Sequence, residues 1–175
     1  MWLMLKETDH RLIKMFNCRL RCSLLDIIMP IITHLGSAGG TIAIVIATAL
    51  TGFILNDSIT TKAGMEAALS LLLCSAVIQV LKKKVNRPRP QFLVEGLKAF
   101  DVPICPYSFP SGHTGAALAV SLTIFSYLPA FGAGLIALSM LIGFSRVYLG
   151  VHFVSDVLAG GLIGGLISLI LTSMI

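Results

Sequence analysis

The chain has 175 residues and a net charge of +5, yet only 12% of its residues are charged and 56% are hydrophobic. Its mean hydropathy of +0.93 excludes an ordinary soluble domain, in which about a quarter of the residues are charged. The composition indicates an integral membrane protein with several long apolar segments. The positive residues lie in short flanks and one loop, which favours anionic headgroups or a phosphate substrate over nucleic acid as the partner.

The whole chain, 1–175, is predicted to be a single domain, of which 1–23 form an amphipathic flank at the membrane interface. This flank is too polar for a cleavable signal peptide. A disulfide framework and a zinc site are not expected, because no CxxC or Cys/His spacing occurs among the four cysteines, Cys18, Cys22, Cys74 and Cys105.

The apolar stretch 24–55 is too short for two full spans of ~20 residues each, and the segment "HLGSAGG" divides it. We expect two helices here, the first of them tilted or only partly embedded. The later apolar stretches are interrupted by Pro129 and by a polar loop at 82–109, which contains four of the seven prolines (Pro88, Pro90, Pro103 and Pro106). In chain order, the expected helices are 20–35, 40–55, 63–81, 111–127, 130–148 and 151 to the C-terminus. The last helix carries small residues four apart that permit close helix packing: Gly160, Gly161, Gly164 and Gly165.

The predicted fold class is all-α, a polytopic membrane bundle of six transmembrane helices. The third helix ends at Lys82 and the fourth starts at Ser111. The fifth ends near Arg146, and the sixth starts near His152. With up-and-down threading these four ends share one membrane face, so three polar clusters that are distant in sequence should meet there.

The first polar cluster is "LKKKVNRPRP" at 81–90. A positive cap that anchors a membrane helix at the interface would explain it. Its lysines, with Arg87 and Arg89, can equally bind phosphate, because a guanidinium offers a planar fork and an ammonium a point charge. The cluster by itself leaves both interpretations open.

The second cluster is "PSGH" at 110–113, where Ser111 and Gly112 begin a helix that carries His113 in its first turn. An ordinary helix N-terminus with an incidental histidine fits this pattern. The same N-terminus also has free N–H groups and the positive end of the helix dipole, which together form an anion site. In that second interpretation His113 can deliver a proton at the membrane surface.

The third cluster is "SRVYLGVHFVSD" at 145–156, in which Arg146, His152 and Asp156 flank or enter apolar helices. Ionisable groups at such depth are costly and usually functional. Because His152 and Asp156 are four residues apart, they share one helix face. We expect Asp156 to accept a hydrogen bond from one ring nitrogen of His152, leaving the other free to attack. A buried polar pair that ties helices together is the alternative.

A metal site is a further alternative, because His113, His152 and Asp156 can form a ligand set. The sequence has no HExxH motif, and the nearby lysines and arginines repel a metal ion and attract an anion. We therefore expect neither a metal nor another cofactor.

Together the three clusters resemble the three-part signature of the type 2 phosphatidic acid phosphatase (PAP2) family, which also includes bacterial lipid phosphatases and vanadium haloperoxidases. The matching stretches are Lys82-x6-Arg89-Pro90, Pro110-Ser111-Gly112-His113 and Ser145-Arg146-x5-His152-x3-Asp156. Three ordered motifs with every key position present are a far more specific signal than any one of them. The resemblance implies a PAP2/haloperoxidase-like helical core.

The resemblance also implies a role for each matched residue. His152 is the nucleophile that forms a phosphohistidine, Asp156 orients it, and His113 protonates the leaving oxygen and then deprotonates the attacking water. The residues implied to hold the phosphoryl oxygens are Lys82, Arg89, Ser111, Gly112 through its backbone N–H, and Arg146. Arg87 is also followed by proline, but only Arg89 has a lysine seven residues before it.

The implied function is metal-independent hydrolysis of the terminal phosphate of a lipid phosphate. Undecaprenyl diphosphate, phosphatidylglycerol phosphate, phosphatidate and the lipid A phosphate all fit, and the motifs do not separate them. The expected partners are thus a lipid phosphate and the bilayer, without nucleic acid. A small membrane channel or transporter and an inactive relative that binds lipid phosphates remain the alternatives.

The expected location is the plasma membrane, with several spans. If six helices cross, the N-terminus lies opposite the active face, and the positive-inside rule then favours an extracytoplasmic site. If the first helix does not cross, this inference reverses.

Overall fold

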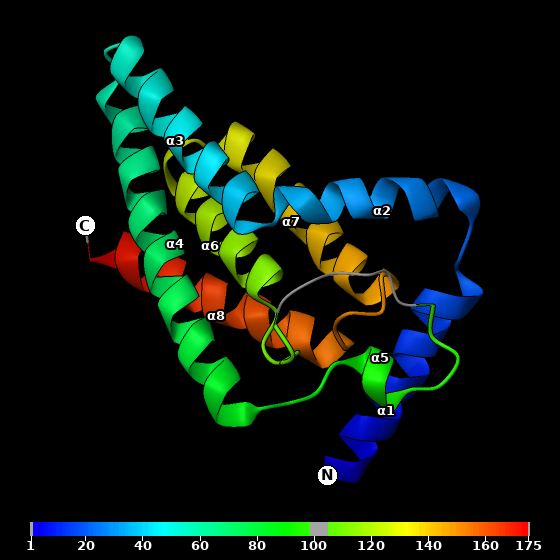
Figure 1. The fold of residues 1–175 in the computed structure, drawn as a ribbon. Helices are drawn as coiled ribbons and strands as arrows, with labels where there is room; N and C mark the ends of the chain where they lie inside the picture. Colours follow the sequence, from blue (N-terminus) through cyan, green and yellow to red (C-terminus); the bar gives the residue numbers. More distant parts are fainter. Residues whose placement is uncertain (1, 99–104, 175) are drawn as a thin grey trace.

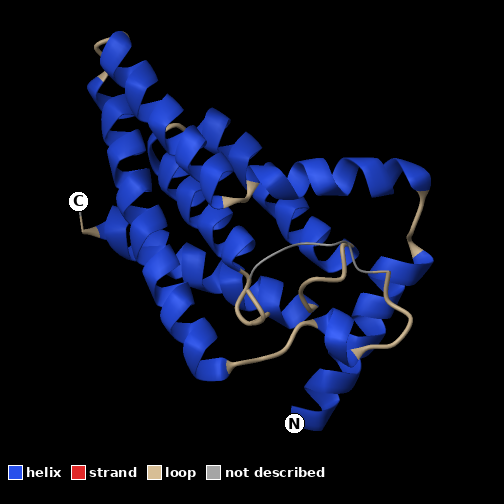
Figure 2. Cartoon of the chain, viewed as in Figure 1, coloured by secondary structure: helices blue, strands red, loops and turns tan. Residues whose placement is uncertain are grey.

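The computed structural model describes residues 2–98 and 105–174, so Pro103 of the predicted loop lies outside the described residues (Figure 1). Within these ranges the chain is helical and forms no strand, as the all-α prediction requires (Figure 2). An isolated antiparallel bridge joins Pro88 to Tyr107. In chain order the elements are α1 (Trp2–Lys14), the π-helix η1 (Met15–Arg19), α2 (Ser23–Leu35), α3 (Ala38–Ile54), α4 (Ser58–Val85), α5 (Pro90–Leu93), α6 (Gly112–Tyr127), α7 (Pro129–Tyr148) and α8 (Val154–Ser173).

The predicted first and second membrane helices form one bent pair, α2 and α3, with 58° between them. The connection has only two residues, and Ser37 caps α3 by accepting a hydrogen bond from the Gly40 backbone N–H at 3.2 Å. Such a short connection bends the chain without reversing it. The six-span count is therefore not confirmed. Within the described residues, α4, α7 and α8 are each long and apolar enough to cross a membrane, and the bent pair is a fourth candidate.

Helix α4 is longer than the predicted 63–81 at both ends. It starts at Ser58 because the Asp57 carboxylate accepts a hydrogen bond from the Ile59 backbone N–H at 3.0 Å and so caps the first turn. It ends at Val85, after which Asn86 adopts a left-handed conformation with φ of 50°. The three lysines of the first cluster consequently lie in the last turn of a membrane helix.

Helix α6 is the centre of the bundle and packs against α4, α7 and α8 (Figure 1). Its contact with α8 depends on glycine, as predicted. A Cβ atom at Gly160 would lie 2.3 Å from the Ser111 carbonyl oxygen, and one at Gly164 would lie 2.3 Å from the Gly115 carbonyl oxygen. The backbones of α6 and α8 therefore touch where the site begins.

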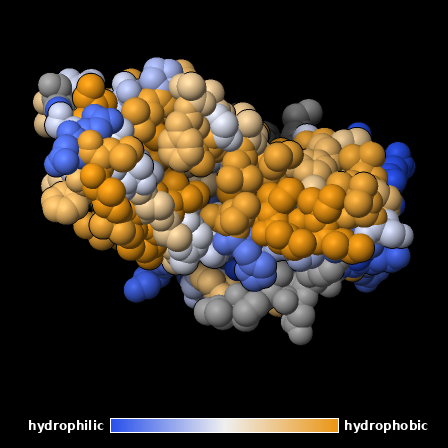
Figure 3. All heavy atoms as spheres, turned by 90° about the horizontal axis from the view of Figure 1, so that it is seen from above, coloured by the Kyte–Doolittle hydropathy of each residue, from blue (hydrophilic) through white to orange (hydrophobic). Residues whose placement is uncertain are grey.

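The outer surfaces of the helices are apolar, and Figure 3 shows one face that is mostly hydrophobic. Large side chains such as Phe53 and Leu162 are 74% and 68% exposed. Exposed apolar area of this extent marks a surface that faces lipid. The chain is accordingly a membrane protein.

The amphipathic N-terminal helix, α1, lies at the same end of the bundle as the start of α8 (Figure 1). The His10 ring stacks on Phe153, with centroids 5.6 Å apart and 14° between the planes. Ile13 is fully buried in a cluster with Val147 and Phe153. The N-terminal segment thus packs beside the polar clusters instead of at the opposite end of the bundle.

Candidate active site

The structure brings the three polar clusters together at one end of the bundle. Arg89 of the first cluster donates a hydrogen bond from Nη1 to the Val151 carbonyl oxygen of the third at 3.3 Å. The Ser111 backbone N–H of the second cluster donates to the Asp156 carbonyl oxygen of the third at 2.9 Å. The helix ends that were expected to share one face therefore do so.

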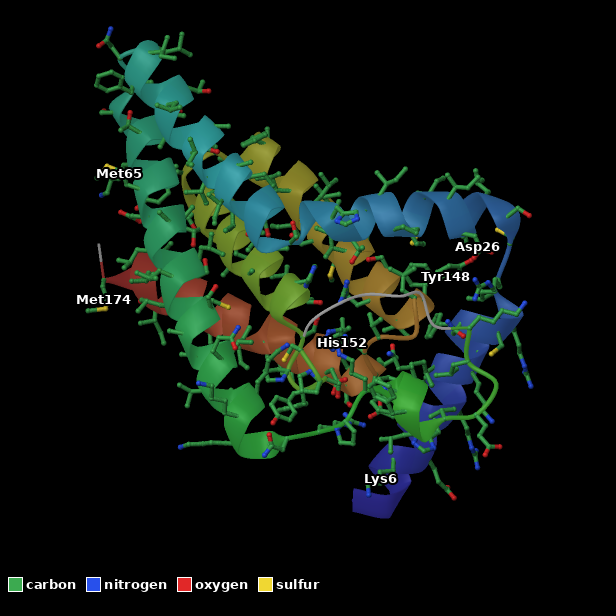
Figure 4. All side chains as sticks on the ribbon, in the orientation of Figure 1. Lys6, Asp26, Met65, Tyr148, His152 and Met174 are labelled. Carbon is green, nitrogen blue, oxygen red and sulfur yellow. The ribbon has the colours of Figure 1, made fainter. Side chains whose placement is uncertain are left out.

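His152 lies in the connection between α7 and α8 and is only 1% exposed (Figure 4). Its Nδ1 atom lies 3.7 Å from Oδ2 of Asp156 and has no hydrogen-bond partner among the described residues. That separation is too long for the predicted hydrogen bond, although it suits an ion pair once the imidazole is protonated. The physical reason is that the Asp156 oxygens are held by other donors.

The electrostatic surroundings keep the His152 imidazole neutral. Burial lowers its pKa well below the ordinary value of 6.5, and the positive charges of Arg146, Arg89 and Lys82 lower it further. A neutral imidazole has a free lone pair, which is what a nucleophile or a proton acceptor needs.

Three buried cations surround this imidazole, and none of them has a carboxylate within salt-bridge distance among the described residues. Lys82, Arg89 and Arg146 are 8%, 6% and 2% exposed. Lys82 Nζ makes only a weak 3.9 Å contact with the sulfur of Cys105, and Arg89 Nε donates to the Cys105 carbonyl oxygen at 2.7 Å. Buried cations without a carboxylate partner are costly, so this arrangement suits an anionic ligand.

Arg146 points to the same conclusion. Its Nη1 atom donates to the hydroxyl of Thr33 on α2 at 2.7 Å, but its buried Nε–H has no acceptor among the described residues. An orphaned N–H on a buried guanidinium is a donor that a bound oxyanion can satisfy.

The N-terminus of α6 opens toward the same place. Ser111 is its N-cap residue but makes no capping hydrogen bond, because the hydroxyl pairs with the Thr114 hydroxyl at 2.9 Å. The first N–H groups of a helix have no acceptor within the helix, and Gly112 adds no side chain there. His113 follows as a half-buried residue in the first turn, beside Gly36 at the break between α2 and α3.

Asp156 is fully buried and pairs with Arg87, not with Arg89. Its Oδ1 accepts a hydrogen bond from Arg87 Nη1 at 2.7 Å, and its Oδ2 accepts one from the Phe153 backbone N–H at 2.8 Å. The two arginines of "RPRP" therefore have different partners: Arg89 joins the cations around His152, and Arg87 joins the carboxylate.

Several residues that bind the side chains of this end of the bundle belong to no motif in the sequence. Asp9 of α1 binds Arg87, and Thr33 of α2 holds Arg146. Tyr148 donates its hydroxyl to Asp26 at 2.7 Å and ties α2 to the end of α7 (Figure 4). Each is an ordinary residue of an amphipathic or apolar segment, so only its position in space reveals it.

The described residues do not form the alternative metal site of His113, His152 and Asp156. Within residues 2–98 and 105–174, no three side chains of histidine, cysteine, aspartate or glutamate lie close enough to hold a metal ion. His113, His152 and Asp156 share the site without forming such a set.

Comparison with known proteins agrees with this geometry. Residues 63–175 match the model of the PAP2 superfamily. Phosphatidylglycerophosphatase B of Bacillus subtilis is 33% identical over 156 residues, which cover 80% of this chain and 70% of that protein. An undecaprenyl-diphosphatase of Sulfolobus acidocaldarius is 34% identical, with 62% of this chain and 53% of that protein covered.

A solved structure gives the same result for the fold. The crystal structure of the transmembrane PAP2-type phosphatidylglycerolphosphate phosphatase from Bacillus subtilis superimposes with a TM-score of 0.82 at 27% identity. The superposition covers 98% of this chain and 86% of that one. The family match extends over more than half of the chain and includes most of the polar end of the bundle. The chain belongs to the PAP2 superfamily of phosphatases.

Proposed function

We propose that this membrane phosphatase removes the terminal phosphate of a lipid phosphate without a metal, through a phosphohistidine at His152. The observation that carries the proposal is the set of three buried cations, Lys82, Arg89 and Arg146, that surround a neutral imidazole and have no carboxylate partner within the described residues. A phosphoryl group supplies the missing negative charge, and the imidazole lies next to it.

In the first step the lone pair of His152 attacks phosphorus and the P–O bond to the lipid breaks. The imidazolium form of His113, which the negative charge of the bound phosphate stabilises, gives its proton to the leaving oxygen. Since Nδ1 faces Asp156, we assign the attack to Nε2. The imidazole becomes positively charged as the P–N bond forms, and the nearby Asp156 carboxylate stabilises it. In the second step His113 takes a proton from water, whose oxygen attacks phosphorus and displaces His152.

The cations and the helix N-terminus act on the phosphoryl oxygens. Arg146 Nε–H, Arg89 and Lys82 stabilise the charge that spreads over these oxygens in the pentacoordinate transition state. Ser111 and the backbone N–H of Gly112 add neutral donors at the start of α6. Fixed positive charges in a buried site do the electrostatic work that a magnesium ion does in other phosphoryl-transfer enzymes.

The substrate is proposed to be a lipid because the phosphate site lies at the end of helices with apolar outer surfaces. A tail in the bilayer then keeps the phosphate at the depth of the cations. Phosphatidylglycerol phosphate, undecaprenyl diphosphate, phosphatidate and lipid A phosphate all meet this requirement.

The test is phosphate release from these four lipids in detergent micelles that contain EDTA, with wild type and His152→Ala. We expect wild type to release phosphate from at least one lipid, and the variant to lose at least about 1,000-fold in kcat. Brief reaction with a 32P-labelled lipid should leave acid-labile, base-stable label on wild type only. A channel, a transporter or an inactive relative would release no phosphate, and full activity of His152→Ala would remove His152 as the nucleophile.

We infer the face of the membrane on which this site opens from the distribution of positive charge. Twelve of the thirteen Lys and Arg residues lie at the end of the bundle that holds the site, and Lys62, in α4 near its turn from α3, lies at the other end. The extracytoplasmic site predicted from six crossings placed the N-terminal charges opposite the active face. With α1 beside α8, the positive-inside rule favours a cytoplasmic site.

Impermeant maleimide tests this orientation on intact cells. Cys18 and Cys22 are exposed at the end of the bundle that holds the site. We expect labelling only after the cells are permeabilised, and none of that labelling in the Cys18→Ser/Cys22→Ser control. Labelling of intact cells would place the site outside.

A further inference from the structure

A carboxylate on the N-terminal helix is joined to Asp156 through one guanidinium. Arg87 donates from Nη2 to Asp9 Oδ2 at 2.8 Å and from Nη1 to Asp156 Oδ1 at 2.7 Å. The Asp9 and Asp156 side chains are 7% and 0% exposed, and that of Arg87 is 19% exposed. The three charges therefore form a shielded carboxylate–guanidinium–carboxylate chain that runs from α1 to α8.

Asp9 also binds the first turn of α8 directly. Its Oδ1 accepts a hydrogen bond from the Ser155 backbone N–H at 3.1 Å, and its Oδ2 accepts one from the Ser155 hydroxyl. A side chain from α1 thus satisfies an amide that has no acceptor within its own helix. Arg87 adds a hydrogen bond to the same Ser155 hydroxyl at 2.8 Å.

The guanidinium is fixed in orientation as well as in position. It lies over the Phe153 ring at 4.1 Å from the centroid, while His10 of α1 stacks on Phe153. Phe153 directly follows His152, and its backbone N–H holds the second oxygen of Asp156. Helix α1 therefore holds two residues next to Asp156: Phe153 through His10, and Ser155 through Asp9.

We propose that Asp9 and Arg87 are positioning residues that aim the Asp156 carboxylate at His152. The inference rests on the proposed function, because it concerns the support that His152 receives as it becomes charged. Asp156 Oδ2 lies 3.7 Å from His152 Nδ1, a distance that can shorten to a charge-assisted hydrogen bond when the imidazole takes the phosphoryl group.

The pairing with Arg87 also keeps Asp156 from forming a salt bridge with the cations around His152. Asp156 is close enough to influence both Lys82 and Arg89 electrostatically, and a salt bridge with either would neutralise the proposed phosphate site. Arg87 occupies Oδ1 and keeps the carboxylate away from them. Asp9 in turn binds the other terminal nitrogen of Arg87, so that Arg87 does not become another phosphate ligand.

The test compares Asp9→Asn, Arg87→Gln and the double variant with wild type, in detergent, on whichever lipid phosphate wild type hydrolyses. Glu7→Gln is the matched control, because Glu7 lies on the same helix with its side chain 74% exposed. We expect kcat to fall about 10- to 100-fold in each single variant, with KM changed less than about threefold, as for groups displaced by a fraction of an ångström. The double variant should lose less than the product of the two single losses, since Asp9 acts in large part through Arg87.

Each other outcome has a defined meaning. If wild type releases no phosphate from any lipid, the proposed function fails before the positioning role is reached. If wild type is active and both single variants keep their kcat, the positioning role is wrong while the function stands. Fully additive losses, or a fall in kcat that Glu7→Gln shares, would also overturn it. Arg87→Lys, which keeps the charge but not the planar fork, should recover only part of the lost kcat.

Discussion

Two helix N-termini meet at the site, those of α6 and α8, and they are completed in opposite ways. The α8 terminus is closed by carboxylates of the chain itself: Asp156 accepts from the Phe153 N–H, and Asp9 accepts from the Ser155 N–H. The α6 terminus receives no side-chain cap, because the Ser111 hydroxyl pairs with Thr114. Both ends carry the same partial positive charge, so the difference lies in what satisfies it.

The two termini also differ in the balance of positive and negative side chains around them. Beside α8 the single cation Arg87 lies between two carboxylates, so that group has no excess of positive charge. Beside α6 lie Lys82, Arg89 and Arg146, without a carboxylate in salt-bridge contact within the described residues. One terminus is thus satisfied by carboxylates of the chain, whereas the other fits the negatively charged ligand that we propose.

The largest effect is expected from a change at the α8 N-terminus, which the carboxylates of Asp156 and Asp9 satisfy. Asp156→Asn should lower kcat by about 1,000- to 10,000-fold, because the imidazolium loses its counter-charge. Lipid phosphate hydrolysis by the purified variant measures this loss. Glu66→Gln, a change at the far end of the bundle where Glu66 accepts a hydrogen bond from Tyr127, should keep the wild-type rate. A rate within tenfold of wild type for Asp156→Asn would contradict the proposed support of the His152 imidazolium by the carboxylate at the α8 terminus.

The distance between the two termini can be changed at one glycine. A Cβ atom at Gly160 would meet the Ser111 carbonyl oxygen at 2.3 Å, so Gly160→Ala should push the start of α6 away from α8. We expect kcat/KM to fall about 100-fold, as is typical of displaced catalytic groups. In Gly161→Ala the new methyl meets the flexible end of the Leu118 side chain at 3.0 Å and makes an ordinary contact with the Thr114 methyl at 3.9 Å, so activity should stay within a fewfold of wild type. Equal activities of the two variants would contradict the requirement for close approach.

A catalytic role of Ser111, at the uncapped N-terminus of α6, can be distinguished from ordinary helix capping by comparing Ser111→Ala with Asp57→Ala. Ser111→Ala should lower kcat about tenfold and change the free energy of unfolding by about 1 kcal/mol or less, since the hydroxyl does not cap α6. Asp57→Ala removes a true cap at the other end of the bundle, so it should cost about 1 kcal/mol and leave kcat unchanged. Thermal unfolding and hydrolysis on the same samples measure both quantities, and a reversed pattern would refute the comparison.

The smallest effect concerns pH and the neutral imidazole. The folded protein holds the pKa of His152 well below 6.5, so the unfolded chain binds a proton there that the folded chain does not. Stability from this group is therefore complete above pH 6.5 and falls as the pH drops below it, by at most about 1.4 kcal/mol per pH unit. His152→Gln should lose less stability than wild type between pH 7.5 and 5.5 in thermal unfolding. His34→Gln, at an exposed histidine of α2, should lose as much as wild type.

The sequence by itself determined the helical class, most helix limits and the polar clusters. Apolar runs of about 20 residues and proline-rich breaks are local features, so 111–127 and 130–148 were placed within a residue or two of α6 and α7. Alternating helix directions then placed the ends at Lys82, Ser111 and Arg146 on one face before any contact was known.

The tertiary structure alone decided how α2 and α3 share one bent path and where α1 lies. The bend is held by contacts between distant residues, such as Tyr148 with Asp26 and Arg146 with Thr33, which no local pattern encodes. The choice of Arg87 as the partner of Asp156 has the same origin, because its second carboxylate comes from Asp9, far away in sequence. Local hydropathy fixes which segments enter the membrane, whereas the pairing of charges depends on which side chains the packed helices bring within hydrogen-bond distance.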